Sequence, residues 1–250
     1  MTAVLFIHGF PFDHLLWRHQ LAALSRWRCI APDLPGAGAT PGPGSADAYS
    51  MAAYATHLIG VLNELRIRQA VMCGLSMGGY ITFELLRRFP RRVRAAILCN
   101  TKAAADSPEA QRGRDELAAK ARREGASAVA DELVPKLIAR ATAAEGDERQ
   151  PAVVREVTEM IQRQPVAGIV GALHALRERP DSTPLLAQIR VPVLVMAGDD
   201  DQIAPAAGMR EMARAIPGAT FALVPGAGHV APLERPITVS SALADFLAQL

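Results

Sequence analysis

The stretch AVMCGLSMGGYITFELL, residues 70–86, decides the fold of this chain. It begins with a short apolar run typical of a buried strand and ends with apolar side chains at helical spacing. Between them, GLSMG at 74–78 places Ser76 in a tight turn from strand to helix. Glycines on both sides of the serine let the strand and helix approach closely, and the turn forces a strained serine backbone. The Ser76 hydroxyl is then held above the sheet, which is the geometry of a nucleophile.

An ordinary loop in which Ser76 caps the helix would also explain this pentapeptide, because a short motif remains a hypothesis until its context agrees. The helix is expected to begin at about Met77. Its free backbone N–H groups and positive dipole end favour negative charge beside the serine. A nucleophile also requires a base, a carboxylate and oxyanion donors at the same edge of the sheet, so the rest of the chain distinguishes the two interpretations.

Composition indicates a single compact domain that acts on a small molecule. The 27 basic and 25 acidic side chains among 250 residues leave a net charge of +2, which argues against binding to nucleic acid or to an anionic membrane. Cys29, Cys73 and Cys99 lie in apolar runs without metal-ligand spacing, so we expect buried thiols and no metal site. The sequence shows no signal peptide and no apolar run of membrane-spanning length, which predicts a cytoplasmic protein.

Strand-like and helix-like segments alternate along the chain. Apolar runs predict strands at 4–7, 28–31, 70–73, 93–99, 191–197 and 220–224. Helices are expected between them and at about 50–65, 205–215 and 236–249. This alternation predicts an α/β fold with a mainly parallel sheet and helices on both faces. Ligands of such sheets bind beyond the carboxyl ends of the strands.

From 102 to 186 the strand-like runs disappear, and Ala, Arg and Glu dominate. Several amphipathic helices with Gly and Pro breaks are the natural interpretation. Because this segment lies between two strands, it begins and ends at the ligand-binding edge of the sheet. We therefore predict a core made of 1–101 and 187–250, with a helical cap inserted at 102–186.

Three residues with complementary chemistry each follow a predicted strand: Ser76, Asp201 and His229. A serine hydroxyl needs an imidazole to remove its proton, and that imidazole needs a carboxylate to fix its tautomer and stabilise its charged form. The order Ser, Asp, His along the chain is the one expected when a triad is built on successive strand ends of this kind of sheet. We therefore predict a catalytic triad of these three residues.

Other histidines and carboxylates compete for these roles. The other histidines are His8, His14, His19, His57 and His174, of which His8 is expected to brace a loop. Asp199 and Asp200 could cap a turn or face solvent. Asp201 is preferred because it ends the loop after the strand and precedes Ile203 and Pro205, which fits a turn back toward the sheet edge.

Oxyanion donors are expected from the backbone N–H groups of Phe10, which follows Gly9, and Met77, which follows the nucleophile. Each such donor typically contributes about 3 kcal/mol of transition-state stabilisation. Phe12 and Trp17, together with the side chains at the two donor positions, are candidates for an apolar substrate pocket. They could equally be ordinary core residues, because apolar side chains alone do not identify a site.

Three segments, GLSMGG at 74–79, GDDDQIAP at 198–205 and GAGH at 226–229, resemble motifs of the α/β-hydrolase superfamily. The resemblance extends from His8 to the C-terminus and is closest to small capped esterases and 3-oxoadipate enol-lactonase-like hydrolases. It implies hydrolysis of a carboxylic ester or lactone by a Ser-His-Asp triad without a cofactor. Some members of the superfamily place the acid after the strand that precedes the cap, where this chain has Asn100.

Two departures from the family pattern accompany the resemblance. DLPGAGAT at 33–40 is similar to a glycine loop of the family but has Ala37 and Thr40 where bulkier or serine residues are usual. The two strands that usually precede the first strand are missing here. We therefore expect about six parallel strands, with the strand around Cys29 at an exposed edge that could pair in a homodimer.

Two other functions remain open at this point. The same triad serves C–C bond hydrolases or lyases of the superfamily that act on dicarbonyl or carboxylate substrates, and a cap arginine that binds a substrate carboxylate would favour this class. The candidate arginines are Arg112, Arg114, Arg122, Arg123 and Arg177, which solvated helix faces also explain. A more distant alternative is a ligand receptor on a hydrolase scaffold, because a fold alone does not fix function.

Overall fold

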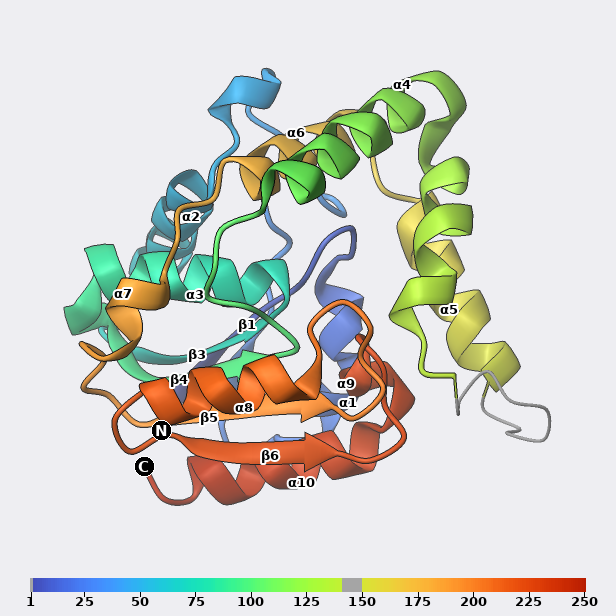
Figure 1. The fold of residues 1–250 in the computed structure, drawn as a ribbon. Coiled ribbons are helices and arrows are strands. Elements are labelled where there is room, and N and C mark those ends of the chain that lie inside the picture. The colour runs from blue at the N-terminus through green and yellow to red at the C-terminus, as the bar shows by residue number, and fades with distance from the viewer. Residues whose placement is uncertain (1, 141–149) are drawn as a thin grey trace.

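The computed structural model describes residues 2–140 and 150–250 and contains one six-stranded sheet (Figure 1). The strands are β1 (Ala3–Ile7), β2 (Arg28–Ile30), β3 (Ala70–Leu75), β4 (Val93–Cys99), β5 (Val193–Gly198) and β6 (Thr220–Val224). Their order is β2-β1-β3-β4-β5-β6, and every neighbouring pair is parallel. The predicted six-stranded parallel sheet is confirmed, including the strand around Cys29 at one edge.

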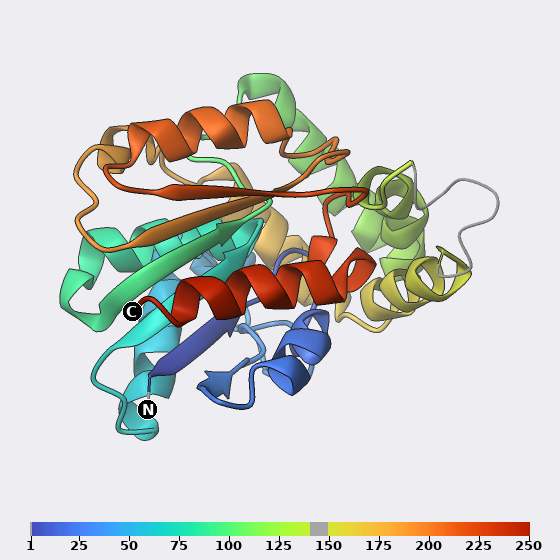
Figure 2. The same cartoon turned by 90° about the horizontal axis from the view of Figure 1, so that it is seen from below.

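The helices of the core cover both faces of this sheet (Figure 2). They are α1 (Arg18–Ala23), α2 (Met51–Glu64), α3 (Met77–Arg88), α8 (Ala206–Ala215), α9 (Ala231–Glu234) and α10 (Pro236–Leu247), with short 3-10 turns at His14–Trp17, Ala46–Ala48 and Pro90–Arg92. Right-handed crossovers place α2, α3 and α8 on one face, while α1 packs against α10 on the other.

Burial along the strands follows their position in the sheet. Every residue of β1, β3 and β5 is buried, as expected for parallel strands covered by helices on both faces. The edge strands β2 and β6 keep partly exposed residues. Long apolar runs in the sequence therefore identify the inner strands, and these strands hold their carboxyl ends in fixed positions.

A helical insertion lies between β4 and β5. It consists of α4 (Pro108–Leu137), α5 (Gln150–Gln162), α6 (Val166–Arg177) and α7 (Thr183–Leu186). In Figure 1 it arches over the core and descends on the side to which the arrows of β5 and β6 point. The first helix breaks at Gly125, whose φ of 82° suits glycine. Among the residues that the structure describes, no helix combines the length and apolar character needed to cross a membrane.

Candidate active site

Ser76 occupies the turn between β3 and α3 with φ 54° and ψ −112°, a conformation that is costly for a residue with a side chain. Glycine is required on both sides of this turn. A Cβ atom at Gly74 would lie 2.2 Å from the carbonyl oxygen of Gly78, and one at Gly78 would lie 2.2 Å from the carbonyl oxygen of Ile7. The motif therefore exists because strand, turn and helix pack too closely for side chains.

The side chain of Ser76 is the accessible group of this stretch. Every residue from 70 to 86 is buried except Ser76, which is half-buried. It makes no capping hydrogen bond to α3. Its backbone is held instead, because its carbonyl accepts from the Gly79 N–H and the Thr101 hydroxyl, both at 2.8 Å. A helix-cap role does not account for this serine.

Asp201 and His229, which follow β5 and β6, form a buried pair. The distance between His229 Nδ1 and Asp201 Oδ2 is 2.9 Å, and each residue is at most 5% exposed. The other carboxylate oxygen accepts the N–H groups of Ile203 and Ala204. Burial alone would raise the pKa of Asp201, but the His229 ring and the surrounding N–H donors outweigh it and lower that pKa. Asp201 is therefore ionised at neutral pH.

Asn100, at the end of β4, contributes a donor to this pair that its sequence position did not reveal. Its Nδ2 lies 2.8 Å from Asp201 Oδ2 and 3.0 Å from the carbonyl oxygen of Gly228. It is fully buried, and its φ is 45°. The amide thus joins the loop that carries the acid to the loop that carries His229.

Two residues that compete for the roles of acid and base, Asp200 and His8, are engaged in other contacts. Asp200 forms an ion pair with Arg140 at 2.7 Å. His8 is buried, which lowers its pKa, and its neutral ring bridges the Gly9 carbonyl and the Leu34 N–H at 2.9 and 3.0 Å. His8 therefore braces the loop after β2, as expected, and is not available as a base.

Glu234 is a second buried group that sequence reasoning missed. Its carboxylate accepts the N–H of Gly228 at 2.9 Å and the N–H of Ala139, just beyond α4, at 2.8 Å. The His229 N–H donates to the Leu137 carbonyl at 2.9 Å. The loop carrying His229 is therefore fastened to the end of the first helix of the insertion.

The two expected oxyanion donors lie on either side of the Ser76 turn. Met77 is the first residue of α3, and Phe10 follows Gly9, where a Cβ atom would lie 3.3 Å from that of Ser76. Within residues 2–140 and 150–250, neither the Phe10 nor the Met77 backbone N–H donates to a protein acceptor. Their role as oxyanion donors stays a prediction, which needs N–H groups free to bind a substrate oxygen.

The two aromatic residues expected in a substrate pocket differ in position. Phe12 borders a small cavity that Phe10 and Met77 also line. Trp17 is fully buried and packs against Phe6 with ring centroids 5.1 Å apart. Phe12 thus shares a cavity with the two residues expected to donate to an oxyanion, whereas Trp17 belongs to the hydrophobic core.

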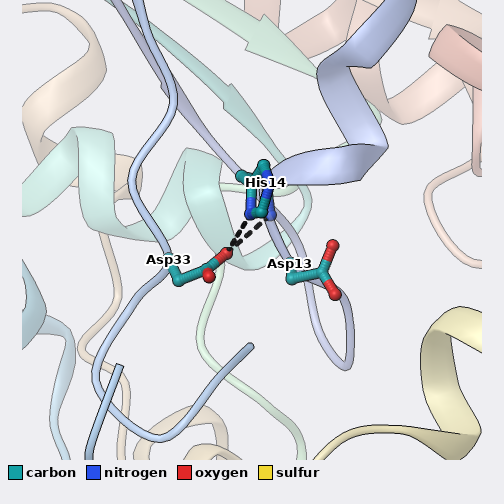
Figure 3. A group of neighbouring side chains, drawn as sticks. All are labelled: Asp13, His14 and Asp33. Atoms are coloured by element: carbon teal, nitrogen blue, oxygen red, sulfur yellow. Dashed lines mark hydrogen bonds and ion pairs between the residues drawn. The ribbon is translucent and has the colours of Figure 1, made fainter. Parts of the chain in front are cut away.

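Asp13, His14 and Asp33 bring three potential metal-ligand atoms within 4.8 Å of one another (Figure 3). His14 faces Asp33 at 2.8 Å, while the carboxylate of Asp13 points away from them. That carboxylate receives two bonds from the Arg163 guanidinium, at 2.8 and 3.0 Å, and one from the Gln164 amide at 2.9 Å. A positive charge already occupies this position, so the cluster fastens the insertion to the loop after β1.

Comparisons with known proteins agree with this fold. A family model described as alpha/beta hydrolase fold matches residues 2–236. The 3-oxoadipate enol-lactonase 2 of Acinetobacter baylyi is 27% identical over 94% of this chain and 84% of its own length. A malate-bound thermophilic esterase from Thermogutta terrifontis is 38% identical with a TM-score of 0.94, covering 100% of this chain and 90% of that one. The enol-lactonase from Burkholderia xenovorans LB400 is 31% identical with a TM-score of 0.89, covering 99% and 91%. The chain belongs to the alpha/beta hydrolase fold family.

Proposed function

We propose that this protein is a serine hydrolase that cleaves a carboxylic ester or lactone through an acyl-enzyme on Ser76. The observation that carries the proposal is the buried His229–Asp201 pair, 2.9 Å apart, at the same sheet edge as the one accessible residue of the turn after β3. The similarity to an esterase and to enol-lactonases supports the same class of reaction.

Each residue has a defined role in this mechanism. With Nδ1–H donating to Asp201, the neutral ring of His229 keeps Nε2 as the base that takes the proton of Ser76. The serine oxygen attacks the substrate carbonyl, and the Phe10 and Met77 N–H groups stabilise the oxyanion. His229 returns the proton to the leaving oxygen, and water then releases the acyl group by the same steps. Every step of this mechanism is carried by side chains, backbone groups and water, so it needs no metal or cofactor.

The C–C cleavage alternative depends on a cationic side chain that is available to a substrate carboxylate. Four of the five insertion arginines considered for this role are paired with carboxylates of the insertion: Arg112 with Glu109, Arg114 with Asp106, Arg123 with Glu124, and Arg177 with Asp115. The contacts of these arginines therefore give this alternative no support. The receptor alternative differs from the proposal in turnover, which the same assay measures.

The test is hydrolysis of p-nitrophenyl acetate by the wild-type protein and by Ser76→Ala. We expect the substitution to lower kcat by about 10⁶-fold, to the background rate, because no other group replaces the nucleophile. Circular dichroism should remain unchanged. Ser107→Ala, at the exposed N-cap of α4, is the matched control and should retain full activity. Full activity in Ser76→Ala would overturn the proposal, and very slow turnover of every ester by the wild type would favour a receptor.

A further inference from the structure

An apolar groove lies between α7 and α8, beside the loop that follows β4. Its volume is about 450 Å³, which is within the usual range for small-molecule sites. Ser76, Asp201 and His229 are not among the described residues that line it, so it is separate from the proposed active site. Its apolar walls are formed by Leu186, Ala204, Pro205, Met209, Met212 and Ala215.

The groove is preformed and elongated. Its floor is firm, because Leu186, Ala204 and Met209 are each no more than 3% exposed. One face of α8 lines it from Pro205 to Ala215, which is about 15 Å at 1.5 Å per residue. A groove of this shape suits an extended apolar chain.

Lys102 gives the groove one cationic group, next to Thr101 in the loop after β4. Among the residues that the structure describes, no carboxylate or carbonyl oxygen forms an ion pair or hydrogen bond with its ammonium group. Partial burial, followed by the nearby charge of Arg179, lowers the pKa of Lys102. The ammonium group therefore lacks the counter-charge that an anionic ligand would supply.

The two carboxylates that act on Lys102 over a distance, Asp106 and Asp201, are already engaged. Asp106 lies 2.7 Å from Arg179 Nη1 and 3.1 Å from Arg114 Nε, so it is shared by two guanidinium groups. Asp201 belongs to the buried pair described above. Cationic groups thus outnumber carboxylates around this part of the groove, which favours an anion there.

The two ends of the groove differ in charge. Lys102 lies at the end where α8 begins, because the charge of Asp201 acts on it and Asp201 accepts the N–H of Ala204, just before Pro205. Glu211, the acidic residue of the lining, is exposed and six positions beyond Pro205, about 9 Å further along α8. An anionic group is therefore favoured at the Lys102 end, and an apolar chain along the rest.

We propose that this groove binds an apolar monocarboxylate with an extended chain, of the kind found in a medium-chain fatty acid. The carboxylate lies at Lys102, and the chain lies along α8 against Leu186 and the two methionines, whose flexible side chains adapt to it. Burial of the chain supplies affinity, and the ammonium group supplies selectivity for the carboxylate. This site goes beyond the reaction proposed for Ser76 and does not depend on it.

The experiment is isothermal titration of the full-length protein with sodium octanoate and, separately, with 1-octanol. We expect one octanoate per chain, bound at least about tenfold more tightly than the alcohol, because only the carboxylate pairs with Lys102. Lys102→Met should weaken octanoate binding by at least about tenfold and remove the difference between the two compounds. Lys136→Met, which removes an exposed lysine outside the groove, is the matched control and should bind like the wild type.

A second variant blocks the groove without disturbing the fold. Gly208 lines the groove, and a Cβ atom there would meet no atom within 4 Å, so Gly208→Leu enters open space and improves the helix propensity of α8. It should abolish octanoate binding. Gly113→Leu is the control, since a Cβ atom at this glycine of α4 also meets nothing within 4 Å and the residue lies outside the groove.

Three results would overturn the proposal: no binding of octanoate to the wild type, equal affinity for octanoate and 1-octanol, or undiminished octanoate binding in Gly208→Leu. The last result would place the ligand elsewhere, for example beside Ser76. None of them bears on whether Ser76→Ala abolishes ester hydrolysis, so failure of this proposal is distinguishable from failure of the proposed function.

Discussion

Two residues other than glycine adopt positive φ at neighbouring strand ends, Ser76 with 54° after β3 and Asn100 with 45° after β4. Their turns support each other. The Ser76 N–H donates to the Cys99 carbonyl at 2.9 Å, and the Thr101 hydroxyl donates to the Ser76 carbonyl. Backbone strain of this kind persists where surrounding contacts over-determine it, and it is concentrated at functional sites. Here the two strained turns place the Ser76 hydroxyl and the Asn100 amide at the same edge of the sheet.

Replacing Asn100 by Ala should weaken the site in a pH-dependent way. The substitution removes one of the donors that hold the pKa of Asp201 below its usual value. A depressed carboxyl pKa contributes stability above the unfolded-state pKa of about 3.9, and this stability is lost as pH falls through the folded-state pKa. The variant should therefore lose about 1–3 kcal/mol of unfolding free energy at pH 7.

Urea unfolding of wild type and Asn100→Ala at pH 7, near pH 3 and near pH 2 checks this expectation. The difference between the two proteins should persist near pH 3, because the folded-state pKa of Asp201 lies below that pH, and should begin to shrink only as the pH falls further. Part of the difference should remain even then, because the bond to Gly228 is lost at every pH. Turnover of p-nitrophenyl acetate at pH 7 should also fall. A stability difference that grows as the pH falls would contradict the role assigned to the Asn100 amide.

At the scale of elements, the turn between α5 and α6 connects the insertion to the loop that carries Phe10. Arg163 and Gln164 both bind the carboxylate of Asp13, which also caps the turn after it by accepting the Leu15 N–H. The side chain of Asp13 is 3% exposed, whereas that of Arg163 is 42% exposed. Removing Arg163 therefore leaves a buried carboxylate without its charged partner, whereas removing the charge of Asp13 leaves an arginine that water can solvate.

This asymmetry gives a testable prediction. Arg163→Met leaves a buried carboxylate without its charged partner, which should cost about 1–3 kcal/mol of unfolding free energy. Asp13→Asn removes the buried charge, keeps a capping oxygen and leaves the partly exposed arginine to be solvated, so it should cost less. Urea unfolding of both variants at pH 7 compares the two. If Asp13→Asn lost more unfolding free energy than Arg163→Met, the ion pair would not be the main contribution of this contact to stability.

Across the whole molecule, the sequence predicts the sheet better than the insertion. The inner strands are continuous apolar runs because both faces of the sheet are covered, and the triad candidates follow directly from the strand ends. The helices of the insertion are rich in Ala, Arg and Glu, so their bounds depend on tertiary packing that no local pattern reports. The structure gives α4 as Pro108–Leu137 with a break at Gly125.

Contacts between distant segments cannot be predicted from the sequence either, because they also depend on tertiary packing. Asp13 and Arg163 are 150 positions apart, and Asn100 and Gly228 are 128 positions apart. Glu234 is an ordinary acidic residue in the sequence, and only the fold shows that it joins two loops. A strand-end motif can be recognised locally, whereas the side chains that hold its partners in place cannot.

The homodimer through the edge strand β2 stays a prediction. This strand has three residues, all of them exposed or half-buried, and its outer edge pairs with no other strand among the described residues. Free strand edges can pair with a second copy. Sedimentation velocity should show a dimer at micromolar concentration, and a monomer that persists at high concentration would contradict the prediction.

The central claim is that Ser76 is the nucleophile, activated by His229 and Asp201. The most direct measurement is mass spectrometry of the protein after reaction with a fluorophosphonate, followed by peptide mapping of the adduct. We expect one adduct on the peptide that contains Ser76 and none in Ser76→Ala. Labelling of Ser76→Ala to the same extent as the wild type, or an adduct on a different residue of the wild type, would contradict the claim.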